Sequence, residues 1–91
     1  MSHEKTPQEV EQLRQHVQEL LDAYVRQERF DFRLIVTKEY VQQEDWLHIL
    51  VLPDRKGVRA YEYAEALSAV SRKLHREEHV ENVLLLPALA A

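Results

Sequence analysis

The chain has 91 residues, of which 45% are hydrophobic and 31% are charged, a composition typical of one globular domain. It contains one glycine and no cysteine, which excludes a collagen-like repeat, a disulfide framework, a thiolate nucleophile and a cysteine-ligated metal. The formal net charge of −4, from 16 acidic and 12 basic residues, argues against a dedicated nucleic-acid-binding domain.

The expected organisation is a disordered lead at residues 1–5, a single domain at residues 6–87 and a short tail at residues 88–91. The lead contains no apolar segment of the kind found in secretory signal peptides. No apolar run in the chain is long enough to span a membrane. These features predict a cytoplasmic protein without a membrane partner.

A first helix is expected at about residues 7–28. Thr6 can cap free backbone N–H groups, Pro7 occupies the first helical position, and Glu9 completes a capping box. The apolar side chains that follow share one helical stripe: Val10, Leu13, Val17, Leu20, Leu21, Tyr24 and Val25. The opposite side carries Gln, Glu and Arg residues, so the helix is amphipathic.

The apolar period then changes from that of a helix to that of a strand. A first strand is expected at about residues 30–40, with an apolar face formed by Phe30, Phe32, Leu34 and Val36. Residues 41–45 show no apolar period and are expected to form a hairpin connection. A second strand at residues 46–52 ends at Pro53, which has no N–H to give to a sheet.

Residues 54–57 are expected to form a turn in which Gly57 adopts a positive φ. A second amphipathic helix follows at about residues 59–77, and its last turns are rich in basic residues, which suits a helix C-terminus. A third strand is expected at residues 80–86. It is apolar on both faces, which is typical of a centrally placed or doubly covered strand.

The element order helix–strand–strand–helix–strand predicts an α+β fold. The first two strands should pair antiparallel, and the connection through the second helix is long enough for a right-handed crossover to a parallel third strand. Both helices should then lie on one face of a three-stranded mixed sheet, as a two-layer α/β sandwich.

Such a sheet carries more apolar surface than two helices can cover. In the second strand, Leu47, Ile49 and Val51 should face the helices, so the alternate residues point away from them. The expected uncovered side chains are Trp46, His48, Leu50, Leu52, Leu84 and Leu86, with Ile35 as a further member. At about 25 cal/mol per Å² of apolar area, leaving these groups in water forgoes several kcal/mol. A contiguous patch of this kind marks an interface.

The occupant expected on this patch is a second copy of the chain, since a twofold axis lets one patch bury itself, or another protein. Two alternatives need no partner. The tail can fold over the sheet and insert Leu89, or the second strand can expose fewer apolar groups than strict alternation implies.

A second candidate site is the basic turn of Arg55, Lys56, Gly57 and Arg59, which precedes the second helix. Basic side chains beside a helix N-terminus can hold a phosphate or an RNA backbone. The alternative is a solvated turn, which is favoured because one glycine without a phosphate-binding motif is weak evidence.

Metal binding and catalysis find little support in the residues. His75 and His79 are spaced to share a helical face, but no third ligand is evident, and histidine also suits the end of a helix. No nucleophile motif or paired-carboxylate motif is present, so no cofactor, metal or catalytic residue is expected, and the chain is expected not to be an enzyme.

The element order, rather than any motif, is similar to that of three small modules: type II KH-like folds, the N-terminal domain of bacterial ribosome-maturation factors, and the cytoplasmic dimerisation domain of cation-efflux transporters. The KH resemblance implies RNA binding, but Gly57 stands alone where that family has a GxxG loop. The transporter resemblance implies metal ligands. The sequence therefore predicts a self-associating protein-interaction module, with a KH-like RNA- or ribosome-associated module as the alternative.

Overall fold

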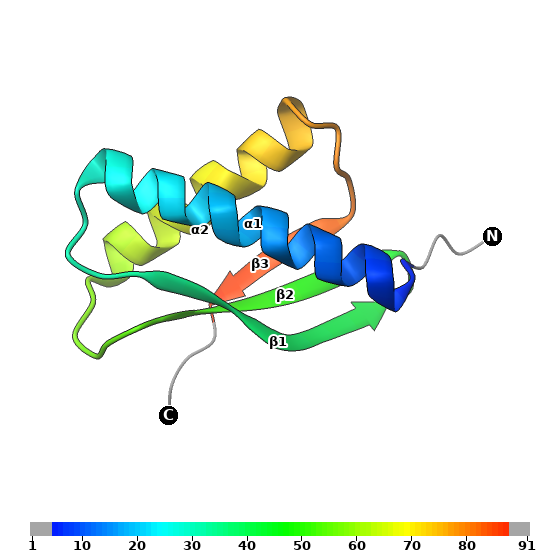
Figure 1. Cartoon of the computed structure of the whole chain (residues 1–91), viewed down its shortest axis with the longest axis horizontal. Helices are drawn as coiled ribbons and strands as arrows, with labels where there is room; N and C mark the ends of the chain where they lie inside the picture. Colours follow the sequence, from blue (N-terminus) through cyan, green and yellow to red (C-terminus); the bar gives the residue numbers. More distant parts are fainter. Residues whose placement is uncertain (1–4, 88–91) are drawn as a thin grey trace.

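A computed structural model describes residues 5–87 of the chain. Its helices and strands follow in the predicted order α-β-β-α-β (Figure 1). They are α1 (Pro7–Glu28), β1 (Leu34–Gln43), β2 (Trp46–Pro53), α2 (Ala60–Arg76) and β3 (Val83–Pro87).

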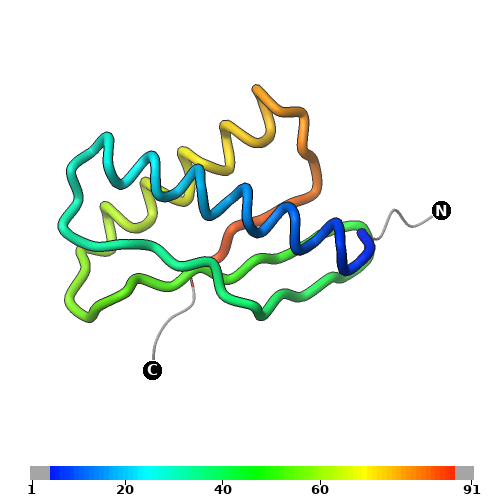
Figure 2. The backbone as a smooth tube through the Cα atoms, viewed as in Figure 1, coloured from blue at the N-terminus to red at the C-terminus, as the bar shows by residue number. Residues whose placement is uncertain are grey.

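The three strands form one mixed sheet in the spatial order β1-β2-β3. β1 and β2 pair antiparallel as a hairpin, and β3 returns parallel to β2 after the chain has passed through α2 (Figure 2). Both helices lie on the same side of this sheet (Figure 1). The predicted α+β two-layer fold is therefore confirmed.

Helix α1 begins as its sequence predicts. The Thr6 side chain accepts a hydrogen bond from the Glu9 N–H at 3.2 Å, and the Glu9 carboxylate accepts one from the Thr6 N–H at 3.1 Å. This reciprocal pair satisfies two backbone donors that the first helical turn leaves free. The helix ends at Arg29, which adopts a left-handed conformation with φ 58°.

The core lies between the helices and the facing side of the sheet. Leu47, Ile49 and Val51 of β2 are at most 1% exposed, as the alternation in the sequence predicts. The helices contribute the buried side chains Val10, Val17, Leu21, Tyr63, Ala66, Leu67, Val70 and Leu74. The Tyr63 hydroxyl donates a hydrogen bond to the Val51 carbonyl, so the one buried phenol does not lack a partner.

The predicted bounds of the first hairpin are wrong at both ends. Phe30 and Phe32 precede β1 instead of opening it, and their rings stack with centroids 5.1 Å apart. At the other end, residues 41–43 continue the strand, and only Glu44 and Asp45 form the turn. Glu44 has a φ of 57°, which suits the tight turn of a two-residue hairpin.

The prediction of a central position for the third strand is also wrong. β3 begins at Val83, lies at an edge of the sheet, and leaves Leu84 41% exposed. β2 occupies the centre. The connection from α2 includes His79 and Asn82, both with positive φ, so the chain reverses sharply before β3 starts. Within the described residues, Leu85 of β3 is buried under the helices, whereas Leu84 on the other side of the strand is exposed.

A bulge interrupts the pairing of β1 with β2. Val36 pairs with Val51, but the next pair along β1 joins Tyr40 to Ile49, so the strand contains additional residues between them. Four positions along β1 correspond to two along β2, so two residues are added and the alternation of side chains beyond the bulge is unchanged. Val41, like Ile35, therefore lies on the side away from the helices, on the same face as its partner His48.

Candidate functional site

The side of the sheet away from the helices is the candidate functional site. Paired residues on neighbouring strands place their side chains on the same face, so the register defines its membership. We call the apolar residues of this surface, together with His48, the open face; they are Ile35, Val41, Trp46, His48, Leu50, Leu52, Leu84 and Leu86. Gln43, the partner of Trp46, adjoins the open face on β1. Seven of these eight side chains are apolar, and none is buried by any part of residues 5–87.

The outer members of the open face are the most accessible. Val41 is 52% exposed, Trp46 42%, Leu84 41% and Ile35 37%. The central members, among them His48 and Leu50, are half-buried by their neighbours. Val41, His48 and Leu84 form one row across all three strands. This row places the single polar side chain of the open face between two apolar ones.

The structure brings all six predicted residues of the uncovered patch onto one face, together with Ile35. Val41 was missed because residues 41–45 were expected to form the hairpin connection, whereas Val41 belongs to β1. The expectation that Leu89 covers the face concerns a residue outside the described ones. Whether a partner covers the open face stays a prediction.

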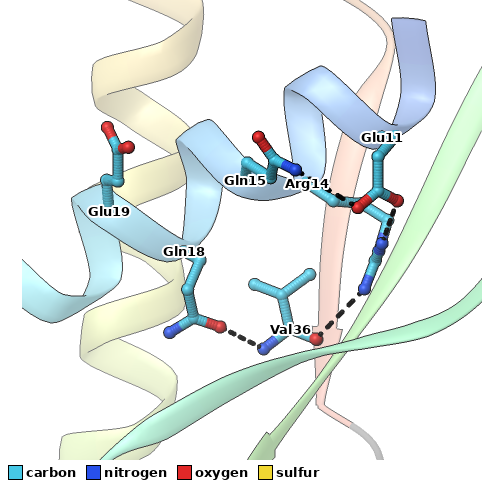
Figure 3. Close-up of a pocket in the computed structure, with 6 residues that line it drawn as sticks. All are labelled: Glu11, Arg14, Gln15, Gln18, Glu19 and Val36. Atoms are coloured by element: carbon cyan, nitrogen blue, oxygen red, sulfur yellow. Dashed lines mark hydrogen bonds and ion pairs between the residues drawn. The ribbon is translucent and has the colours of Figure 1, made fainter. Parts of the chain in front are cut away.

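Side chains of α1 cover the outer edge of β1 (Figure 3). The Gln18 carboxamide accepts a hydrogen bond from the Val36 N–H at 2.8 Å and donates one to the Leu34 carbonyl, also at 2.8 Å. The Arg14 guanidinium donates to the Thr37 carbonyl at 2.7 Å and reaches the Val36 carbonyl at 3.5 Å. These bonds use the peptide groups that a further strand would need.

A shallow hollow of about 340 Å³ lies beside these contacts and is lined by Glu11, Arg14, Gln15, Gln18, Glu19 and Val36 (Figure 3). Its polar side chains bond mainly with one another and with β1: Arg14 and Gln15 both donate to Glu11. The polar groups of this hollow therefore serve to cover the edge of β1, and they do not converge on a space where a ligand could bind.

The predicted basic turn lies between β2 and α2. Gly57 adopts the expected positive φ of 79°. Arg55 forms an ion pair with Asp54, with Nε and Oδ1 3.2 Å apart, which offsets its charge. Lys56 is exposed, and Arg59 begins α2 without a side-chain cap.

A hollow of about 310 Å³ beside this turn mixes charges of both signs, because its lining includes Glu28, Arg29, Asp31, Arg59 and Glu62. Three carboxylates against two guanidinium groups do not favour a phosphate or an RNA backbone. The turn therefore combines basic residues with acidic ones, and the alternative role as an RNA contact stays a prediction without added support.

The histidines do not converge. His16 of α1 is paired with Glu78, whereas His75 and His79 follow one another at the end of α2, where His79 has left the helical conformation with φ 55°. Within residues 5–87 no three His, Cys, Asp or Glu side chains form a group able to hold a metal ion. His48 lies on the open face, on a different element from the three other described histidines.

One carboxylate links the two helices on their outer surface. Glu65 of α2 is hydrogen bonded to Tyr61 and to Tyr24 of α1. Burial and the charge of Glu65 raise the pKa of Tyr24, whereas the hydrogen bond to Glu65 is the main reason that the pKa of Tyr61 is raised. The carboxylate of Glu65 therefore interacts with a phenol on each of the two helices.

Neither helix in the described part of the chain combines the length and apolar character needed to cross a membrane. Comparisons of the sequence with protein families and curated proteins, and of the fold with solved structures, find no match.

Proposed function

We propose that this protein is an assembly module that self-associates by packing its open face against the open face of a second copy. The observation that supports this proposal is the set of seven apolar side chains left uncovered on one side of the sheet, with no cover from residues 5–87. The opposite side of the same sheet is buried by two helices. A contiguous apolar patch of this kind is rare on the surface of monomers and typical of interaction surfaces.

The composition of the open face favours a copy of the same chain over a different partner. None of its eight side chains carries a charge while His48 is neutral, although the chain as a whole has a net charge of −4. The repelling acidic residues therefore stay outside the contact. A twofold axis near His48 and Leu50 would place apolar groups against apolar groups on both sides.

The size of the open face sets the expected affinity. Its 23 strand residues occupy a footprint of about 360 Å² at the usual strand spacing and rise. Stable interfaces bury about 800 Å² on each partner. We therefore expect a dimer that forms in a concentration-dependent way at micromolar protein concentrations.

The proposal is tested by Leu50→Glu, which introduces a charge at the centre of the open face. Sedimentation equilibrium should show a mass that rises with concentration for the natural chain and a monomer for the variant, because burying an unpaired carboxylate is unfavourable. The matched control is Ala23→Glu, which adds the same charge at an exposed position of α1 and should leave self-association unchanged.

Trp46 gives a second readout that needs no substitution. It is the only tryptophan in the chain and is 42% exposed on the open face. Its fluorescence emission should shift to shorter wavelength as the concentration rises and the dimer forms. A monomer at all concentrations up to about 1 mM, or an unchanged mass for Leu50→Glu that retains its helical circular dichroism, would overturn the proposal.

A further inference from the structure

The outer edge of β3 carries backbone groups without partners in the described part of the chain. The Leu47 N–H donates to the Asn82 carbonyl at 2.9 Å, which fixes the pattern of the parallel ladder between β2 and β3. In that pattern the peptide groups of Leu84 face β2, whereas those of Val83 and Leu85 point outward. Outward peptide groups on an edge strand are a template for another strand.

This edge differs from the opposite one. There, Gln18 and Arg14 bond to peptide groups of Leu34, Val36 and Thr37, in the first half of β1. At Val83 and Leu85, no backbone bond beyond the sheet ladder comes from residues 5–87. An added strand would therefore meet open hydrogen-bonding groups at β3 and occupied ones in the first half of β1.

A hollow of about 510 Å³ lies at the start of β3 and is lined by Trp46, Ser71, Arg72, His75, Val80, Glu81, Asn82, Val83 and Leu84. On the helix that borders it, Ser71 lies beside the longer side chains of Arg72 and His75, which are exposed. Ser68 lies about one turn before Ser71 on the same flank of α2. A second chain at this edge would therefore pass beside these four side chains of α2.

We propose that β3 of a second copy adds antiparallel to this edge, so that two sheets join into one six-stranded sheet across a twofold axis. The strand is self-complementary: with Leu84 on the axis, Val83 exchanges both its backbone hydrogen bonds with Leu85 of the partner subunit, and Leu85 does so with the partner's Val83. Pro87, which has no N–H to donate, then lies beyond the last bonded pair.

This contact uses a different surface from the packing of two open faces. A twofold axis perpendicular to the sheet keeps all four helices on one side, so both open faces remain available. One copy can therefore engage one partner through its edge and another through its open face. The two contacts together would build assemblies larger than a dimer.

The test is a single cysteine at Leu84. The natural chain has no cysteine, so a disulfide in this variant can only join two copies. Residues opposite each other in a non-hydrogen-bonded antiparallel pair lie within disulfide reach, whereas face-packed sheets lie about 10 Å apart. Leu84→Cys should form a covalent dimer under mild oxidation, with at least about tenfold more product than Val41→Cys.

Val41→Cys is the matched control because Val41 lies in the same row of the open face, at the β1 edge, with similar exposure. Equal yields from the two variants would indicate random collision and overturn the proposal. A Leu84→Cys protein that stays monomeric under oxidation would overturn it as well.

Two further variants in the Leu84→Cys background separate this contact from the open-face dimer. Ser68→Arg places a long charged side chain on the flank of α2 and should abolish the covalent dimer, whereas Ala23→Arg on α1 should not. Leu50→Glu should leave the covalent dimer intact even where it abolishes open-face association. Loss of the disulfide in Leu50→Glu would show that the edge contact does not exist by itself.

Discussion

The two edge strands of the sheet differ in whether side chains bond to their outward backbone groups. At β1, the carboxamide of Gln18 and the guanidinium of Arg14 bond to Leu34, Val36 and Thr37, in the first half of the strand. At β3, no side chain within residues 5–87 does the same for Val83 or Leu85. Exposed edges promote unwanted pairing, so a protein that covers one edge and leaves the other open restricts strand addition to one side.

The comparison predicts that, of the two side chains that cover the edge of β1, Gln18 contributes more to the free energy of unfolding. Gln18→Leu removes the partners of the Val36 N–H and the Leu34 carbonyl while keeping an apolar stem of similar size. Because part-buried backbone groups without partners are unfavourable, the free energy of unfolding should fall by about 2 kcal/mol in urea titrations.

Gln15→Leu is the matched control, since Gln15 lies one helical turn earlier on α1 and bonds only to Glu11. Its effect should stay below about 0.5 kcal/mol. In hydrogen exchange, the Val36 amide should exchange faster in Gln18→Leu than in Gln15→Leu. Equal stability of the two variants would show that the bonds of Gln18 to the edge of β1 do not stabilise the fold.

A smaller effect is expected at Arg14, whose side chain is only 12% exposed. Arg14→Met preserves the length of the side chain and removes its bonds to the Val36 and Thr37 carbonyls. We expect a loss of about 1 kcal/mol, measured by thermal unfolding. Glu11→Gln, which weakens the exposed ion pair with Arg14 and the hydrogen bond from Gln15, should change stability by less than half of that amount. A reversed ranking would mean that the ion pair, and not the strand edge, is what Arg14 stabilises.

The smallest effect concerns Asp54, which fastens the start of β1 to the end of β2. Its carboxylate accepts a hydrogen bond from the Arg33 N–H at 3.0 Å, and this bond, followed by the one from Arg55, lowers the pKa of Asp54 below 3.8. A carboxyl group whose pKa is lower in the folded state stabilises the protein above the unfolded pKa and loses that contribution as the pH falls.

The difference in stability between the natural chain and Asp54→Asn should therefore be constant near neutral pH and shrink as the pH drops below about 4. Urea titrations of both proteins over this range measure it. Both proteins must be compared because the pKa of Glu9 is lowered too, by its hydrogen bonds with Thr6, and this contribution is the same in the natural chain and the variant. A difference that does not depend on pH would exclude the bond to Arg33 as its source.

Local signals in the sequence predict the parts of the fold that depend on neighbours along the chain. The capping residues around Thr6 locate the start of α1, Gly57 locates the turn before α2, and the alternation around Ile49 identifies the buried face of β2. In each case the energy that selects the structure comes from a few adjacent residues. The six predicted residues of the open face follow from the same alternation.

Features that depend on distant contacts were missed. Gln18 is indistinguishable in the sequence from other polar residues on the outer side of α1, because its role depends on where the helix crosses β1. The extension of β1 through Val41, and the edge position of β3, likewise depend on pairing between strands and not on local preference. Phe30 was predicted to lie in the first strand because it belongs to the alternating apolar residues, but it packs against the core before β1 begins.

The bonds of Gln18 have a consequence for changes in chain length. Each residue of an α-helix turns by about 100°, so one residue inserted between Gln18 and the end of α1 would rotate the carboxamide away from β1 or displace the rest of the helix from the core. A single carboxamide thus fixes the rotational setting of the whole helix against the sheet. Insertions and deletions should accordingly be better accommodated in the connection between α2 and β3, residues 77–82, than within α1.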